Sequence, residues 1–345
     1  MCFNLKKYIL IFFSLTYFSL HIRGFKTELK CSSDYTFIVA GHAYGSHYDT
    51  NKGLHPPFLK ALCSEKIPPH EFIIFTGDAV RNSTEEEFNM LSNSLKKPFY
   101  MSMGNHEKSD YGIKFFKKKY GNLYYSFSLG TEKFIFLNSQ ELEMAISDIQ
   151  VEFLVHELNE IRNEKNIFIF FHELLWNSKS IYKGINSNGR CRHENIKGKS
   201  NFWEEIFPVL QKFKNLKFFI IAGDVGGNPD AIPAYYEKID NIELIASGMG
   251  EIKDENLLLI SKRNNSIVKK LFSLNRFEFD SLELYNLEFL KKFYKPKPKN
   301  NIILRNKNLT KKNNLTIKTL ISNYYKIILL VFLTIFLTIK YFVKR

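Results

Sequence analysis

Short apolar runs of β type alternate with amphipathic stretches along most of the sequence, and this pattern predicts a mixed α/β domain. Buried strands are expected at residues 36–39, 72–75, 99–101, 167–171, 217–222 and 242–246. Two adjacent runs, 123–129 and 133–137, predict a hairpin that turns at Gly130-Thr131. The remaining expectations are helices at 58–63, 85–95, 147–163 and 202–213, a long polar loop at 177–200, and closing strands at 257–260 and 277–285.

Side chains that can bind a metal follow five of these apolar runs, either directly or just past a glycine. They are His42, Asp78, Asn105 with His106, His172 and Asp224. Taken singly each is a weak signal, because a lone histidine after an apolar run is more often a core residue. In α/β sheets, however, ligand sites form in the loops at the carboxyl ends of strands. The ordered set therefore predicts that these side chains converge on one site.

This ordered set resembles the motifs of the calcineurin-like metallophosphoesterase superfamily, which read D-x-H, G-D, G-N-H, H and G-H-x-H. Gly77-Asp78 and Gly104-Asn105-His106 match in full, and His172 matches the single histidine. The resemblance covers roughly residues 33 to 260. It implies a four-layer α/β/β/α sandwich built on two mixed sheets.

The resemblance also implies roles for the individual residues. Asp78 would be the central or bridging carboxylate, Asn105 would offer its carbonyl oxygen, and His172 would offer a ring nitrogen. Asp224 stands where the family has the first histidine of G-H-x-H. Mixed nitrogen and oxygen ligands of this kind suit Mn, Fe or Zn. His106 would be a catalytic residue that donates to the phosphate and the leaving group without binding the metal.

Two motifs depart from the family pattern. The aspartate of D-x-H is replaced by Ala40, and the last histidine of G-H-x-H by Gly226. A second metal would then keep only His42 and Asp78, so we expect either one ion, or a second one held only when substrate phosphate adds oxygens. The spacing supports none of the loop residues that could substitute, and it leaves Tyr44 open as a phosphate donor or a packing residue. Those loop residues are His47, Asp49 and His193.

The resemblance implies a metal-dependent phosphoesterase, in which a metal neutralises the phosphate and lowers the pKa of a bound water to about 7. The expected substrate is a phosphorylated small molecule, lipid or glycan. The incomplete ligand set leaves an alternative, a non-catalytic binding protein with a degenerate metal site. Metal content, and then hydrolysis of a generic aryl phosphate, would distinguish the two.

The net charge is concentrated near the C-terminal end. Of the formal net charge of +14, ten positive charges fall in residues 291–318, which contain no acidic residue, so about +4 is left for the rest of the chain. The domain therefore lacks the broad basic face of a nucleic-acid-binding protein, and no nucleic acid is expected as a partner.

Apolar segments at both ends of the sequence predict attachment to a membrane. Residues 1–30 contain an apolar run from Tyr8 to Ile22 after Lys6-Lys7, which is typical of a signal peptide or a signal anchor. Residues 31–290 would form the phosphoesterase-like domain, 291–322 a basic linker, and 323–345 a transmembrane helix. One or two membrane passes are expected, depending on whether the first segment is cleaved.

The sidedness signals conflict. The N-terminal segment predicts translocation of the domain, whereas the basic linker predicts the opposite by the positive-inside rule. Since whole domains translocate largely regardless of charge, an extracytoplasmic domain is favoured.

The four cysteines have no C-x-x-C spacing, which excludes a zinc ribbon. Cys31 and Cys63 are either a disulfide pair in an oxidising compartment or two isolated thiols.

Overall fold

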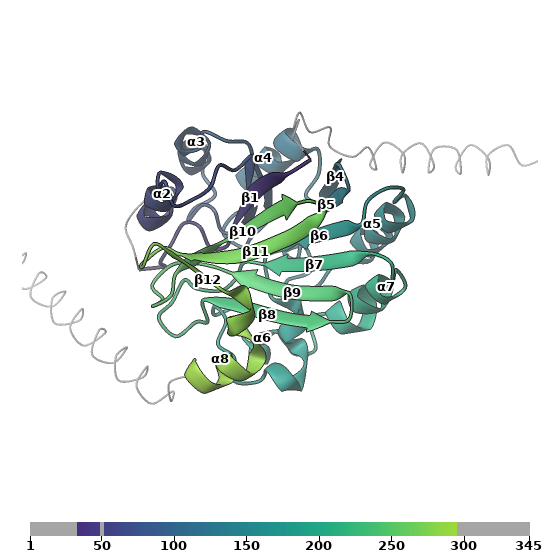
Figure 1. Ribbon diagram of the computed structural model, residues 1–345. Coiled ribbons are helices and arrows are strands. Elements are labelled where there is room, and N and C mark those ends of the chain that lie inside the picture. The colour runs from purple at the N-terminus through teal and green to yellow at the C-terminus, as the bar shows by residue number, and fades with distance from the viewer. Residues whose placement is uncertain (1–32, 49–51, 295–345) are drawn as a thin grey trace, which may run out of the picture. The chain divides into compact units, whose positions relative to one another are not determined.

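The computed structural model describes residues 33–48 and 52–294, which form two six-stranded sheets with helices outside them (Figure 1). The strand order of the first sheet is β12-β11-β10-β1-β2-β3, and that of the second is β4-β5-β6-β7-β9-β8. Both sheets contain parallel and antiparallel neighbours. This arrangement confirms the predicted sandwich of two mixed sheets.

The strands of the first sheet are β1 (Tyr35–Ala40), β2 (Phe72–Thr76), β3 (Phe99–Ser102), β10 (Asn256–Arg263), β11 (Ser266–Ser273) and β12 (Glu278–Asp280). Those of the second are β4 (Tyr125–Leu129), β5 (Glu132–Phe136), β6 (Asn166–Phe170), β7 (Lys217–Ala222), β8 (Ala234–Ile239) and β9 (Ile242–Ser247). β4 and β5 pair antiparallel, which confirms the predicted hairpin.

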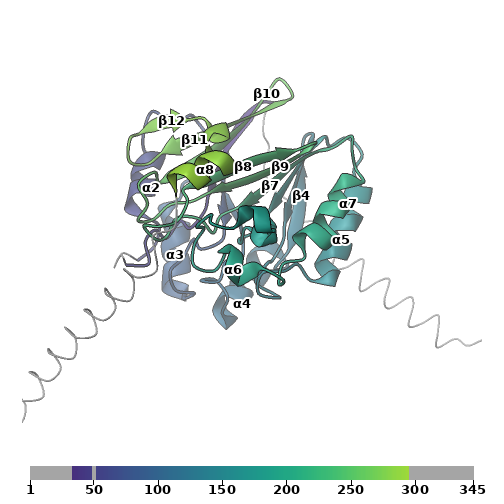
Figure 2. The ribbon, with the colours of Figure 1, turned by 90° about the horizontal axis from the view of Figure 1, so that it is seen from below.

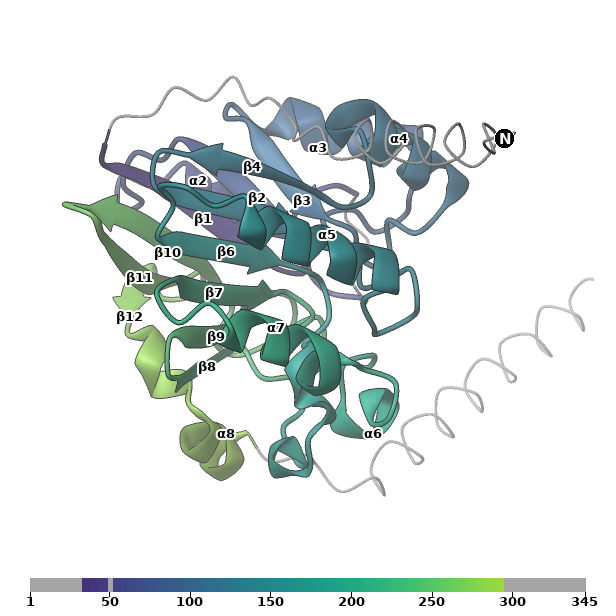
Figure 3. The same cartoon turned by 90° about the vertical axis from the view of Figure 1, so that its right-hand side faces the viewer.

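Helices flank the outer sides of the two sheets. On the side of the first sheet lie α2 (Pro56–Leu62), α3 (Glu85–Ser94) and α4 (Asp110–Tyr120). Figures 2 and 3 show α5 (Asp148–Asn159) and α7 (Phe207–Gln211) against the outer face of the second sheet. The remaining α-helices of the described residues are short, α6 (His193–Ile196) and α8 (Leu287–Phe293).

Aromatic side chains fill the space between the sheets. The ring of Phe37 in β1 meets the rings of Phe134 in β5 and Phe168 in β6 edge-on, with centroids 5.5 and 5.4 Å apart. Tyr100 in β3 packs on Phe127 in β4 at 4.5 Å. Such pairs add to the free energy gained by burying large apolar surfaces. They therefore stabilise the packing of one sheet on the other.

Parallel pairing brings the candidate ligands to one edge. β1, β2 and β3 run parallel, and so do β5, β6, β7 and β9. Their carboxyl ends therefore lie together, as sites in α/β sheets require.

Three predicted elements differ from the structure. Residues 202–213 begin as a π-helical turn, Phe202–Ile206, before α7, because Pro208 lacks the N–H that would continue an α-helical ladder. Residues 277–285 contain only the short β12 and a 3₁₀ turn, Leu282–Tyr285. The loop 177–200 contains α6 and further 3₁₀ turns.

The predicted terminal segments lie outside the described residues, and so does Cys31. The boundaries proposed for the signal segment, the linker and the transmembrane helix therefore stay predictions. Within residues 33–48 and 52–294, none of the helices has the length and apolar character needed to cross a bilayer.

Candidate metal centre

Asp78 lies just after β2. Two consecutive residues there have left-handed backbone conformations, Gly77 with φ 80° and Asp78 with φ 55°. A glycine is required at position 77, because a Cβ atom there would lie 2.4 Å from Nδ1 of His172. Oδ1 of Asp78 accepts the backbone N–H of His106 at 3.1 Å. Oδ2 is buried and has no hydrogen-bond partner.

Glu107 holds this turn in place. Its buried carboxylate accepts the backbone N–H groups of Asp78 at 2.8 Å, Ala79 at 2.8 Å, Val80 at 3.1 Å and Gly104 at 2.8 Å. Burial, followed by the charge of Asp78, raises the pKa of Glu107. No role for Glu107 is predicted from the sequence; its position directly after G-N-H was the available signal.

His172 follows β6 and presents one nitrogen to the other candidate ligands. Its Nδ1 is 2.9 Å from the carbonyl oxygen of Thr76, which can only accept, so the proton is on Nδ1 and Nε2 faces the site. Nε2 lies 3.1 Å from Oδ1 of Asn105, 3.4 Å from Oδ2 of Asp78 and 3.8 Å from Oδ1 of Asp224.

The electrostatic environment at this point favours a positive charge. Burial lowers the pKa of His172, but the carboxylates of Asp78 and Asp224 outweigh it, and the pKa lies well above the ordinary value. Two buried carboxylates facing one point therefore need a cation between them, which is either a proton on an imidazole or a metal ion.

His42 follows β1 with φ 54°. Its Nδ1 is 2.8 Å from the carbonyl oxygen of Gly45, which leaves Nε2 facing Oδ2 of Asp78 at 3.6 Å. Burial lowers the pKa of His42, so the ring is the neutral form that ligates metals. A Cβ atom at Gly227 would lie 2.5 Å from this ring, so backbone without a side chain packs against it.

Asp224 follows β7, and its backbone N–H donates to the carbonyl oxygen of His172 at 3.0 Å. Its Oδ2 accepts the thiol of Cys191 at 2.7 Å, whereas its buried Oδ1 has no hydrogen-bond partner. Burial, followed by the Asp224 charge, raises the pKa of Cys191 well above its ordinary value. No role for Cys191 is predicted from the sequence, because no local pattern marks it.

His106 lies beside this group with its ring turned toward Tyr44. Its Nδ1 is 2.6 Å from the carbonyl oxygen of Arg81, and its Nε2 is 3.2 Å from the hydroxyl of Tyr44. The Arg81 guanidinium stacks over the Tyr44 ring at 4.9 Å. His106 and Asn105 are only half buried, whereas the other candidate site residues are fully buried, so the site is accessible on this side.

The predicted ligands converge. Within the described ranges, His42, Asp78 and Asp224 offer ligand atoms that all lie within 4.8 Å of one another, and Nε2 of His172 lies beside both carboxylates. The chemistry of this set and the two unpartnered carboxylate oxygens fit a divalent cation. That these residues bind a metal stays a prediction.

Of the residues considered as substitutes, the two that the structure describes, His47 and His193, do not join the group. Nδ1 of His193 is hydrogen bonded to the carbonyl oxygen of Asn177, and the ring of His47 packs against Tyr48. Asp49 lies outside the described residues.

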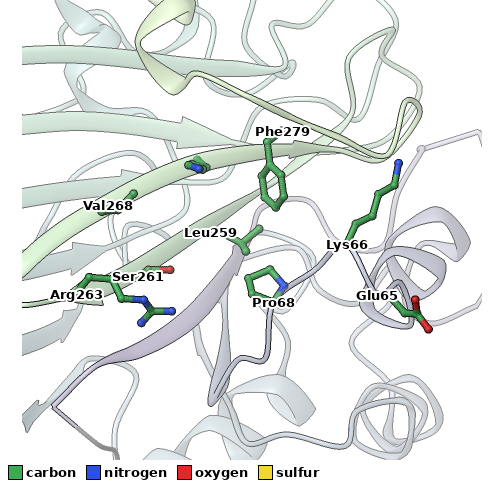
Figure 4. Close-up of a pocket in the computed structure, with 9 residues that line it drawn as sticks. Glu65, Lys66, Pro68, Leu259, Ser261, Arg263, Val268 and Phe279 are labelled. Carbon is green, nitrogen blue, oxygen red and sulfur yellow. The ribbon is translucent and has the colours of Figure 1, made fainter.

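A surface pocket of about 420 Å³ lies elsewhere, on the outer face of the first sheet (Figure 4). Its walls come from the segment after α2 and from β10, β11 and β12, and it includes Lys66, Arg263 and Phe279. None of the candidate ligands lines it, so the pocket and the ligand group are separate features.

The sequence profile of the calcineurin-like phosphoesterase family matches residues 42–248. The chain therefore belongs to this family, whose members typically bind divalent metals. No curated protein sequence matches the chain.

Several solved structures resemble the fold at low sequence identity. GAP50 of Plasmodium, described as the anchor in the inner membrane complex, is 15% identical, with a TM-score of 0.45, over 73% of this chain and 89% of that one. A predicted phosphoesterase of Streptococcus pneumoniae is 9% identical, with a TM-score of 0.33, over 71% and 92%. Vps29 of Entamoeba histolytica, complexed with zinc, is 10% identical, with a TM-score of 0.34, over 71% and 96%. Similarities of this size say nothing about activity.

Proposed function

We propose that this chain is a metal-dependent phosphoesterase that hydrolyses a phosphate ester at the site between the two sheets. The observation that supports this most directly is the pair of buried, unpartnered oxygens, Oδ2 of Asp78 and Oδ1 of Asp224, which lie 3.4 and 3.8 Å from Nε2 of His172. Burying carboxylate oxygens without partners is costly unless a cation compensates them. A divalent ion in this position would provide that compensation.

The proposed ligands of one ion are Asp78, Asn105, His172 and Asp224, and His42 is the further ligand on the side where a second ion would lie. A Mn, Fe or Zn ion bound there would supply Lewis acidity and lower the pKa of a water molecule to about 7. Because only His42 and Asp78 remain for a second ion, we propose one well-occupied site. The backbone carbonyl of Arg81 orients the His106 ring through Nδ1. When the His106 ring is doubly protonated, its Nε2 could exchange the hydroxyl of Tyr44 for the leaving-group oxygen of a substrate and donate its proton to that oxygen, which would leave the neutral ring.

The experiment is metal analysis of the purified full-length chain, followed by assays with p-nitrophenyl phosphate and bis(p-nitrophenyl) phosphate. We expect bound Mn, Fe or Zn and hydrolysis of at least one of these esters. Asp78→Asn should abolish both metal binding and hydrolysis, whereas Asp240→Asn, at an exposed turn position with φ 53°, should leave both unchanged. A chain that binds none of these metals would contradict the proposal, and bound metal without hydrolysis would indicate the non-catalytic alternative.

We further propose that the chain is attached to a membrane and acts on a phosphorylated lipid or glycan near the bilayer, with its domain on the extracytoplasmic side. The apolar runs at 8–22 and 327–339 support this. Extraction of membranes from expressing cells with alkaline carbonate tests attachment, and protease accessibility of the domain in sealed vesicles tests its side. Release by carbonate would contradict attachment.

A further inference from the structure

The two carboxylate oxygens of Asp224 have different surroundings. Oδ2 is 2.7 Å from Sγ of Cys191, while Oδ1 faces Nε2 of His172 at 3.8 Å and has no hydrogen-bond partner. A carboxylate can only accept a hydrogen bond, so the Cys191 thiol is the donor. One oxygen is thereby occupied and the other is left for the centre of the site.

Cys191 lies between the two segments that carry His172 and Asp224. Its Sγ accepts the backbone N–H of Leu174, two residues after His172, at 3.3 Å. The backbone N–H of Cys191 donates to the carbonyl oxygen of Asn188. The backbone N–H of Asn188 in turn donates to the carbonyl oxygen of Asp224 at 3.2 Å. The thiol is fully buried and held from both sides, so its position relative to Asp224 is fixed.

We propose that Cys191 is a positioning residue for the metal centre: its thiol fixes the rotation of the Asp224 carboxylate, so that Oδ1 alone is offered to the ion. The final torsion of an aspartate is broad and poorly defined by itself. A donor on one oxygen selects one orientation and favours ligation through the other. This inference rests on the proposed metal-dependent function and adds to it a residue that the family motifs do not contain.

The test measures metal affinity of the full-length chain, by competition with a fluorescent chelator for Mn²⁺ and Zn²⁺. Losing a partner of a metal ligand typically weakens metal binding by about 10- to 100-fold, and we expect that loss for Cys191→Ala. Cys191→Ser keeps a donor and should restore most of the affinity. Cys63→Ala removes an exposed cysteine and should have no effect.

Two further measurements separate positioning from other roles. In an Asp224→Ala background, Cys191→Ala should cause no additional loss of affinity, because the thiol acts through Asp224. Thermal unfolding in EDTA should show that the metal-free variants remain folded. A further loss in the Asp224→Ala background, or full affinity in Cys191→Ala itself, would overturn the proposal.

Cobalt substitution tests whether the sulfur binds the ion directly. A strong thiolate-to-cobalt charge-transfer band that disappears in Cys191→Ser would show Cys191 to be a ligand and would also overturn the positioning role. The experiments distinguish failure of the proposed metal-dependent function from failure of the positioning role of Cys191. A wild-type chain that binds no metal refutes the proposed function, whereas a metal-binding chain whose affinity is unchanged by Cys191→Ala refutes this inference alone.

Discussion

Oδ2 of Asp78 lies 3.4 Å from Nε2 of His172, although the two residues leave strands of different sheets. Asp78 follows β2 and His172 follows β6, and a backbone carbonyl of β2 also orients the His172 ring. The candidate centre therefore depends on how the two sheets pack together.

Glu107→Gln should destabilise the chain by roughly 2–4 kcal/mol, because an amide cannot accept four backbone N–H groups and buried donors lose their partner. Denaturant unfolding measures this. Glu86→Gln is the control, since Glu86 makes an exposed ion pair with Lys52 at 3.0 Å that contributes about 0–1 kcal/mol. Equal stabilities of the two variants would contradict the role given to Glu107.

Gly227→Ala should be more damaging than Gly121→Ala. Both positions have positive φ, 73° and 83°, but a Cβ at 227 meets the His42 ring whereas a Cβ at 121 meets nothing within 4 Å. The shared backbone strain is about 1–2 kcal/mol, and overpacking against His42 should add about 1–3 kcal/mol. Unfolding experiments on both variants check the difference, and similar losses would show that the contact with His42 has no energetic effect.

Removal of metal should lower the stability of the wild-type chain. A ligand at a hundredfold excess over its Kd stabilises the folded state by about 2.7 kcal/mol if the unfolded chain does not bind it. We expect Mn²⁺ or Zn²⁺ to raise the Tm in EDTA-stripped protein, and Asp78→Asn to abolish this rise. Asp240→Asn should keep it. A rise that survives in Asp78→Asn would place the ion elsewhere.

His106→Gln should lower kcat by about 10²- to 10⁴-fold, the usual contribution of a general acid, and leave metal content unchanged. Its ring contacts Arg81 and Tyr44, and its centroid is 6.5 Å from that of His42. His156→Gln, on the outer helix α5, is the matched control. Loss of metal together with activity would instead make His106 part of the ligand set.

The strands that carry candidate ligands could be predicted from the sequence, because an apolar run that leads to Asp78 or His172 is a local pattern. The sequence was not sufficient for β8 or β11. In β8, Glu237 and Lys238 interrupt the apolar pattern, and in β11 Lys269 and Lys270 do the same. β8 is an edge strand of its sheet, so polar side chains are tolerated there. In β11, Lys269 is compensated by an ion pair with Glu243 of the other sheet, a contact that no local pattern predicts.

The contacts that hold the candidate ligands in place could not be predicted from local sequence patterns. Cys191 meets Asp224 across 33 positions, and Glu107 reaches back 29 positions to Asp78. Nothing in the residues adjacent to Cys191 indicates such a contact, and the position of Glu107 directly after G-N-H does not reveal which groups it binds. These relations exist only once the loops at the carboxyl edge have been brought together by strand pairing.

The bond from His172 to the Thr76 carbonyl has a consequence for how this chain can change over time. That acceptor belongs to the peptide backbone, so no replacement of the threonine side chain removes it. The direction of the imidazole therefore depends on the position of the β2 backbone and not on the side chain at position 76. Substitutions around the ring can therefore accumulate and alter what the site does, while the ring itself keeps pointing the same way.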